Sequence, residues 1–173
     1  MGNRTHFWLG QLLVVVAFTV ALACNSASAQ DHNHETVSVI NGSDHPELIP
    51  DSVAYRLYFT TVSLPLHPTA EQAQLHEAQL GAIGLSDRGK QVMIEQLAIF
   101  KAKFDRLVAN YNKLINAGRE PNFSLFGIRQ ESLVADTRKA LSSALAEEDL
   151  GRLNAYVQNE KRHMQVADEK GTK

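Results

Sequence analysis

Residues that cross-link or interrupt a chain are scarce in this sequence. Its 173 residues include one cysteine, five prolines and ten glycines. Because Cys24 has no second cysteine to pair with, the chain can form no internal disulfide and no thiolate cluster for zinc. With so few prolines and glycines, long segments run without a break, which favours helices over many short strands. A buried apolar core must therefore hold the fold together.

The sequence also lacks an excess of either charge and lacks familiar catalytic motifs. Seventeen basic residues oppose nineteen acidic ones, for a net charge of −2. No basic stripe points to nucleic acid, so we expect no nucleic-acid partner. The sequence contains no glycine-rich nucleotide loop, no H-E-x-x-H and no G-x-S-x-G. Glu147 and Glu148 are adjacent, so on a helix they point in different directions and make a poor acid/base pair. We therefore expect a non-catalytic protein.

The first 29 residues have the features of an export signal. A short basic start at Arg4 is followed by an uncharged apolar stretch over residues 7–23. The small residues that follow end in an A-x-A site at Ala29, which is typical of signal-peptide cleavage. The sequence predicts cleavage between Ala29 and Gln30 and a periplasmic or secreted protein.

Two alternatives to this cleavage stay open. Small residues precede Cys24 as in bacterial lipoprotein signals, although Ala21 stands where such signals usually carry leucine. A lipidated Cys24 would tether the protein to a membrane, whereas cleavage after Ala29 would release it. Retention of the apolar stretch as an anchor is the other alternative, at the lower limit of length for a span. Membrane contact is expected only through the signal peptide or a lipidated Cys24.

Hydrophobic periodicity predicts helices over most of the remaining chain. Thr69 and Gln72 form a capping box, Ser86 is a helix N-cap, Gly118 is a stop and Ser124 is a further N-cap. The expected helices cover 51–63, a segment from Thr69 to the glycines at 81 and 84, 86–118, 124–146, and a segment that starts with the acidic turn at 147–149.

The third of these segments carries the strongest pattern. A heptad seam of about three repeats, typical of a coiled coil or a bundle helix, runs along it. We expect this helix to be the central strut and its seam to be the most buried surface, with Phe100 and Phe104 equally important. The seam residues are Met93, Leu97, Phe100, Phe104, Leu107, Tyr111 and Leu114.

These segments predict an all-α fold, an antiparallel bundle of four to five helices joined by short connections. A signal peptide and a flexible polar arm precede the bundle. The expected parts are a signal peptide at 1–29, a disordered histidine-containing arm at 30–43, the bundle at 44–167 and a frayed tail at 168–173.

A metal site is predicted at the mature N-terminus. Cleavage after Ala29 would expose Gln30-Asp31-His32. A free amine, two backbone nitrogens and the imidazole of His32 can bind Cu²⁺ or Ni²⁺ in a square plane, and His34 adds a further donor. Four histidines and methionines of the bundle could in principle ligate haem, but ordinary packing explains them. We therefore expect no cofactor other than copper or nickel. The four residues are His76, Met93, His163 and Met164.

The sequence thus favours an exported helical protein that acts as a binding, chaperone-like or structural module of the cell envelope. Its partner would be an unknown envelope protein or a second copy of the chain. The alternative is a metal-handling protein that uses the histidine arm. A chaperone-like role requires an exposed apolar patch, which we expect on the second helix because its apolar stripe is thin. Tyr55, Arg56 and Tyr58 could line a pocket, although packing and a solvated arginine also explain them.

Overall fold

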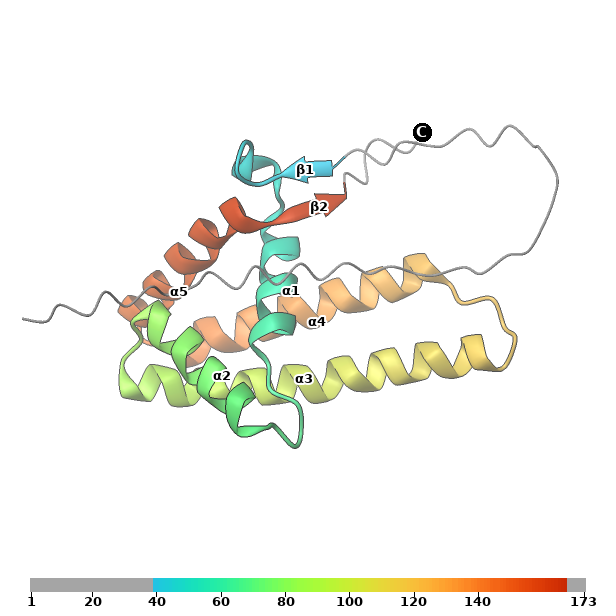
Figure 1. The fold of residues 1–173 in the computed structure, drawn as a ribbon, viewed down its shortest axis with the longest axis horizontal. Helices are drawn as coiled ribbons and strands as arrows, with labels where there is room; N and C mark the ends of the chain where they lie inside the picture. The colour runs from blue at the N-terminus through green and yellow to red at the C-terminus, as the bar shows by residue number, and fades with distance from the viewer. Residues whose placement is uncertain (1–38, 168–173) are drawn as a thin grey trace, which may run out of the picture. The chain divides into compact units, whose positions relative to one another are not determined.

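A computed structural model describes residues 39–167 of the chain, and these form an all-α protein with one small sheet (Figure 1). The predicted signal peptide, Cys24, the proposed metal ligands and the tail at 168–173 lie outside the described residues. The elements are β1 (Val39–Asn41), α1 (Asp51–Val62), α2 (Ala70–Ile83), α3 (Asp87–Asn116), α4 (Phe123–Ala144), α5 (Glu147–Glu160) and β2 (Gln165–Ala167), with 3-10 turns at Pro46–Leu48 and Lys161–His163.

The two strands correct the expectation of a disordered arm over residues 39–43, and the rest of that predicted arm, 30–38, lies outside the described residues. β1 pairs antiparallel with β2, so that Val39 lies opposite Ala167 and Asn41 opposite Gln165. The backbone N–H of Gly42 donates to the Met164 carbonyl oxygen at 2.8 Å. A Cβ at Gly42 would collide with the backbone of the Lys161–His163 turn, so this close approach requires glycine. The expectation fails over 39–43 because the strand partner lies more than 120 residues away in sequence.

Helix starts follow local capping, mostly as predicted. Thr69 and Gln72 form the capping box of α2, and the Ser86 hydroxyl accepts from the Gly89 backbone N–H at the start of α3. α4 differs, because its N-cap is Asn122 rather than Ser124. The Asn122 side-chain oxygen accepts from the Leu125 N–H at 2.9 Å. Asparagine is as good an N-cap as serine, and because Asn122 precedes Ser124, the helix begins at the earlier residue.

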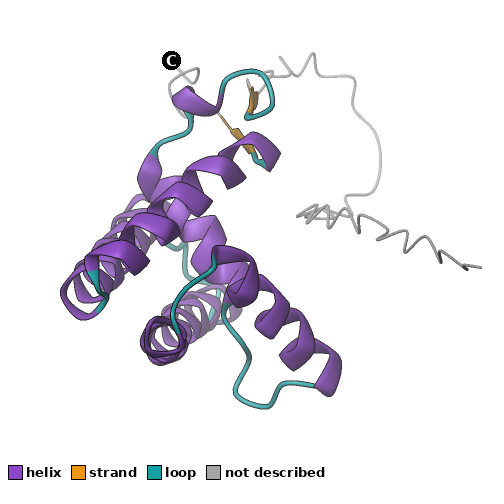
Figure 2. Ribbon diagram, turned by 90° about the vertical axis from the view of Figure 1, so that its left-hand side faces the viewer, coloured by secondary structure: helices purple, strands orange, loops and turns teal. Residues whose placement is uncertain are grey.

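The long helices α3 and α4 lie side by side and antiparallel, and α1 runs across them (Figures 1 and 2). α1 also contacts α5, so three helices surround it. Five of its twelve residues are buried, namely Ala54, Tyr55, Tyr58, Phe59 and Val62. The Phe59 ring, fully buried, lies 5.3 Å from the Phe100 ring of α3. The short α1, rather than the long α3, is thus the most completely buried helix.

The predicted seam of α3 is buried over its first half only. Met93, Leu97 and Phe100 are at most 1% exposed. Phe104, Leu107 and Tyr111 are half-buried, and Leu114 is 39% exposed. The expectation of a fully buried seam is therefore wrong toward its C-terminal end. Toward the C-terminal end of α3, α4 is the one described helix that runs beside it (Figure 1), and one neighbouring helix cannot cover a wide apolar stripe.

A buried carboxylate joins the start of α3 to the first turn of α5. Asp149 is 4% exposed, and it accepts from the Ser86 backbone N–H at 2.9 Å and from the Ser86 hydroxyl at 2.5 Å. These bonds, above all that from the hydroxyl, hold the pKa of Asp149 below its usual 3.8. A Cβ at Gly89 would collide with the Asp149 carboxylate, so glycine permits this contact. Ser86 thus caps α3 and anchors α5 at once.

The burial of the seam predicts unequal effects for its two phenylalanines. Phe100→Ala should lower the free energy of unfolding by about 3–5 kcal/mol, because it leaves a cavity among fully buried neighbours. Phe104→Ala should lower it clearly less, because the ring stacks on Phe100 but is partly exposed. Urea unfolding of both variants measures the difference. Equal losses would contradict the burial gradient.

The Asp149 contact predicts a stability difference that depends on pH. A carboxyl whose pKa is lowered on folding stabilises the protein above its unfolded pKa of about 3.9, and this contribution is lost as the pH falls through the native value. The parent should therefore exceed Asp149→Asn in stability by roughly 1 kcal/mol or more at pH 7. Urea unfolding at pH 7 and pH 3 should show the gap closing in acid, and a gap independent of pH would refute the assignment.

Candidate functional site

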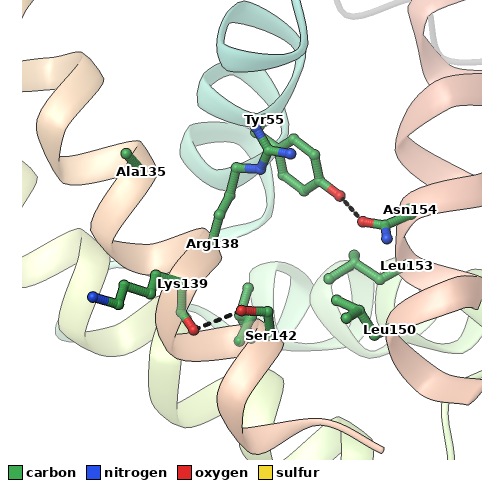
Figure 3. Close-up of a pocket in the computed structure, with 9 residues that line it drawn as sticks. Tyr55, Ala135, Arg138, Lys139, Ser142, Leu150, Leu153 and Asn154 are labelled. Carbon is green, nitrogen blue, oxygen red and sulfur yellow. Dashed lines mark hydrogen bonds between the residues drawn. The ribbon is translucent and has the colours of Figure 1, made fainter. Parts of the chain in front are cut away.

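A pocket of about 350 Å³ lies between α1, α4 and α5 (Figure 3). Its position follows from the crossing of α1, which holds α4 and α5 apart on either side of the Tyr55 ring. The lining residues are Tyr55 from α1, Ala135, Arg138, Lys139, Leu141 and Ser142 from α4, and Leu150, Leu153 and Asn154 from α5.

The polar side chains of this pocket hold one another in place. The Arg138 guanidinium carbon lies 4.3 Å from the centre of the Tyr55 ring, a cation–π contact. The Tyr55 hydroxyl donates to the side-chain oxygen of Asn154. Burial raises the pKa of Tyr55, more than the Arg138 charge lowers it, so the phenol keeps its proton near neutral pH. Because the Asn154 oxygen is used in this way, its amide N–H groups are left to donate.

The charge of the pocket is positive. None of the lining side chains carries a carboxylate. Within residues 39–167, no carboxylate oxygen lies within 4.0 Å of a side-chain nitrogen of Arg138 or Lys139. Asp51 is close enough for Arg138 to help lower its pKa, but the hydrogen bonds from Lys161 and Gln158 lower it more. No carboxylate of the described part of the chain therefore prevents Arg138 from binding an external anion.

The two cations differ in direction. In Figure 3 the Lys139 side chain extends away from Tyr55 and Asn154, whereas the Arg138 side chain reaches the Tyr55 ring. The leucines of the lining form an apolar base of the pocket, and two of them, Leu141 and Leu153, are each 1% exposed. An apolar base with one fixed guanidinium and amide donors suits a small organic anion that has an apolar part.

Little of this pocket is evident from the sequence. Of the three residues suggested as pocket lining, Tyr55 does line it, Tyr58 packs in the core, and Arg56 is half-buried elsewhere on α1. Arg138 and Asn154 carried no sequence signal, because they lie on different helices and only the fold brings them together.

The metal and membrane hypotheses concern mostly residues that the structure does not describe. Gln30, Asp31, His32, His34, Cys24 and the Ala29 cleavage site all precede residue 39. Between residues 39 and 167, no three His, Cys, Asp or Glu side chains are grouped so as to hold a metal ion. No helix in that same range is long and apolar enough to span a bilayer.

The four haem donor candidates lie in different settings. His76 and Met93 are buried, at 6% and 0% exposure. His163 is exposed and Met164 half-buried, in the connection between α5 and β2. Met93 therefore fills the core, as its seam position predicts.

Among the described residues, five of the ten exposed large apolar side chains lie at the tip of the α3–α4 pair and one lies on α2, which corrects the expected place of an apolar patch. On α2 only Leu75 belongs to this exposed set. The tip patch consists of Leu114 and Ile115 at the end of α3 and Phe123, Leu125 and Ile128 at the start of α4, exposed by 39–70%. At this tip the apolar seam of α3 extends past the part of the helix that the neighbouring helices cover.

Comparison with known proteins supplies no family for this chain. No family model, no curated protein and no solved structure matches it. Function is therefore argued from the geometry of the described residues.

The tip patch predicts where an apolar dye should bind. Phe123→Ser combined with Ile128→Ser should remove most of the fluorescence of a bound naphthalene sulfonate dye, because it breaks up the patch. Stability should change by only about 0.5 kcal/mol, as for other exposed positions. Leu75→Ser on α2 is the matched control and should leave dye binding nearly unchanged. A greater loss of dye fluorescence in Leu75→Ser than in the double variant would show that the dye binds on α2 instead.

Proposed function

We propose that this is an exported, non-catalytic binding protein of the cell envelope, and that it binds a small organic anion with an apolar part. The observation that carries the proposal is Arg138, which is fixed on the Tyr55 ring above an apolar base and has no carboxylate partner among residues 39–167. Carboxylates and phosphates are the groups that a fixed guanidinium binds best, because two parallel N–H donors match two oxygens.

In this proposal the helices act as an antiparallel bundle that serves as a scaffold. α1 supplies the Tyr55 ring, α4 supplies the cation and α5 supplies the amide donors, so the pocket exists only when all three pack together. Residues on packed helices are held more precisely than residues on loops, and this lowers the entropy lost on binding. The tip of the α3–α4 pair gives the same protein an apolar surface for an envelope partner or a second copy.

Export itself is proposed from the first 29 residues, with cleavage after Ala29 and lipidation of Cys24 as the minority form. Metal handling by Gln30, Asp31, His32 and His34 is the alternative function, and it is supported by the sequence pattern alone.

Hexanoate is a suitable probe for the pocket. Titration calorimetry at pH 7 should show hexanoate binding more tightly than methyl hexanoate, which has the same chain without the charge. Arg138→Met should weaken hexanoate binding by about tenfold or more, because a bond to a charged group is lost. The hexanoate affinity of Arg138→Lys should lie between those of the parent and Arg138→Met, since lysine keeps the charge but lacks the planar pair of donors.

Lys139→Met is the matched control. It removes the same unit of charge from the next residue, but from a side chain that points away from Tyr55, so binding should change by about twofold at most. Thermal melts establish that each variant is folded. Equal weakening by both substitutions, or equal binding of acid and ester, would contradict the proposed site.

A further inference from the structure

The tip patch of the α3–α4 pair lies among an excess of basic side chains. Residues 106–131 contain four arginines and lysines and two glutamates, a net charge of +2, whereas the whole chain carries −2. The four cations are exposed, and no nitrogen of their side chains lies within 4.0 Å of a carboxylate oxygen in residues 39–167. They are Arg106, Lys113, Arg119 and Arg129. The tip therefore combines apolar side chains with a local excess of positive charge.

The apolar side chains of the tip are presented to the outside. Phe123, the first residue of α4, is 70% exposed, and Ile128 is 62% exposed. The Phe123 ring rests edge-on against the Tyr111 ring of α3, with 5.6 Å between the ring centres, so packing within the protein holds it at the surface. At this end the α3–α4 pair extends past α1, α2 and α5 (Figure 1). None of these three helices therefore lies between the tip and a partner that approaches it.

The backbone of the turn at the tip pairs its polar groups inside the protein. The Gly118 N–H donates to the Ile115 carbonyl oxygen at 2.9 Å, and the Arg119 N–H donates to that of Leu114 at 3.0 Å. Gly118 closes α3 in this way because its φ of +68° lies in the left-handed region that favours glycine. Asn122 caps the first turn of α4 on the other side. This pairing lowers the cost of moving the tip from water into less polar surroundings.

The charge of the tip favours an anionic bilayer over a second copy as the partner. Two copies that meet tip to tip would bring two net charges of +2 together, and this repulsion opposes association. The headgroups of an anionic bilayer attract the same cations. Apolar side chains beside lysine and arginine are typical of protein surfaces that enter the boundary between headgroups and acyl chains.

We propose that the tip of the α3–α4 pair docks on an anionic lipid bilayer. The apolar side chains of the tip patch enter the boundary between headgroups and acyl chains, and Lys113, Arg119 and Arg129 lie among the lipid phosphates. This contact is additional to the membrane contact expected from the signal peptide or a lipidated Cys24. It is independent of the Arg138 pocket, so the outcome of the hexanoate test does not decide it.

A tryptophan placed at the tip reports the contact directly. Trp8→Phe removes the one natural tryptophan, and Phe123→Trp then puts a single indole in the tip patch of the full-length protein. Vesicles of equal parts phosphatidylglycerol and phosphatidylcholine should shift its emission to the blue, and brominated acyl chains should quench it. Leu75→Trp in the same background is the matched control on α2, where Leu75 is 57% exposed, and should show neither effect. Ile128→Trp is a second tip reporter, should Phe123→Trp fail to fold.

Vesicle composition tests the part played by charge. The tip reporter should respond to the anionic vesicles at about tenfold lower lipid concentration than to pure phosphatidylcholine. Arg119→Gln combined with Arg129→Gln should remove most of this preference. Arg88→Gln combined with Arg162→Gln removes the same charge from exposed residues away from the tip, and should keep it.

Three outcomes would overturn the proposal. The first is a tip indole whose emission the anionic vesicles do not change, and the second is an equal response to both kinds of vesicle. The third is a blue shift that needs no vesicles and grows with protein concentration, which would assign the tip to a second copy of the chain.

Discussion

The packing of α1 across the α3–α4 pair is the contact on which the rest of the structure depends. No disulfide is available, so the burial of apolar side chains must hold the helices together, and α1 contributes five of the buried residues at the place where it meets α3, α4 and α5. The Phe59–Phe100 contact lies at this crossing. The same short helix also shapes the Arg138 pocket, because Tyr55 forms one of its walls. Damage to the crossing would therefore change the stability and the pocket together.

The sequence predicts the helices well because their ends are determined locally. The Thr69–Gln72 box and the Ser86 cap each need only residues within one turn, and both are present. The burial of a helix face is not determined locally, since it depends on which other helix packs against that face. The heptad seam continues to Leu114, but α1 contacts α3 at Phe100, and toward the end of α3 the one described helix beside the seam is α4. Periodicity identifies the face that a helix can bury, and the tertiary arrangement decides how much of it is buried.

The candidate site was largely invisible in the sequence for a related reason. Tyr55, Arg138 and Asn154 are separated by 83 and 16 residues along the chain, and none belongs to a local motif. His76 did carry a signal. It lies three and four residues from Ala73 and Leu80, on the apolar face predicted for α2, and a histidine on such a face is expected to be buried with a hydrogen bond. The Val62 bond fulfils half of that expectation and leaves Nε2 as the part that needs explanation.

A hydrogen bond inside the protein decides which polar atoms are left without a partner, and the packing around them decides whether these atoms can be reached. In the Arg138 pocket, the Tyr55 hydroxyl occupies the side-chain oxygen of Asn154 and leaves the N–H groups of this exposed residue to donate. At His76, the Val62 carbonyl oxygen occupies Nδ1, and Nε2 is enclosed by the surrounding residues. The first arrangement leaves donors at the surface beside the Arg138 guanidinium, whereas the second leaves an acceptor inside the core. The same kind of internal bond therefore prepares a pocket in one place and only orients a core side chain in the other.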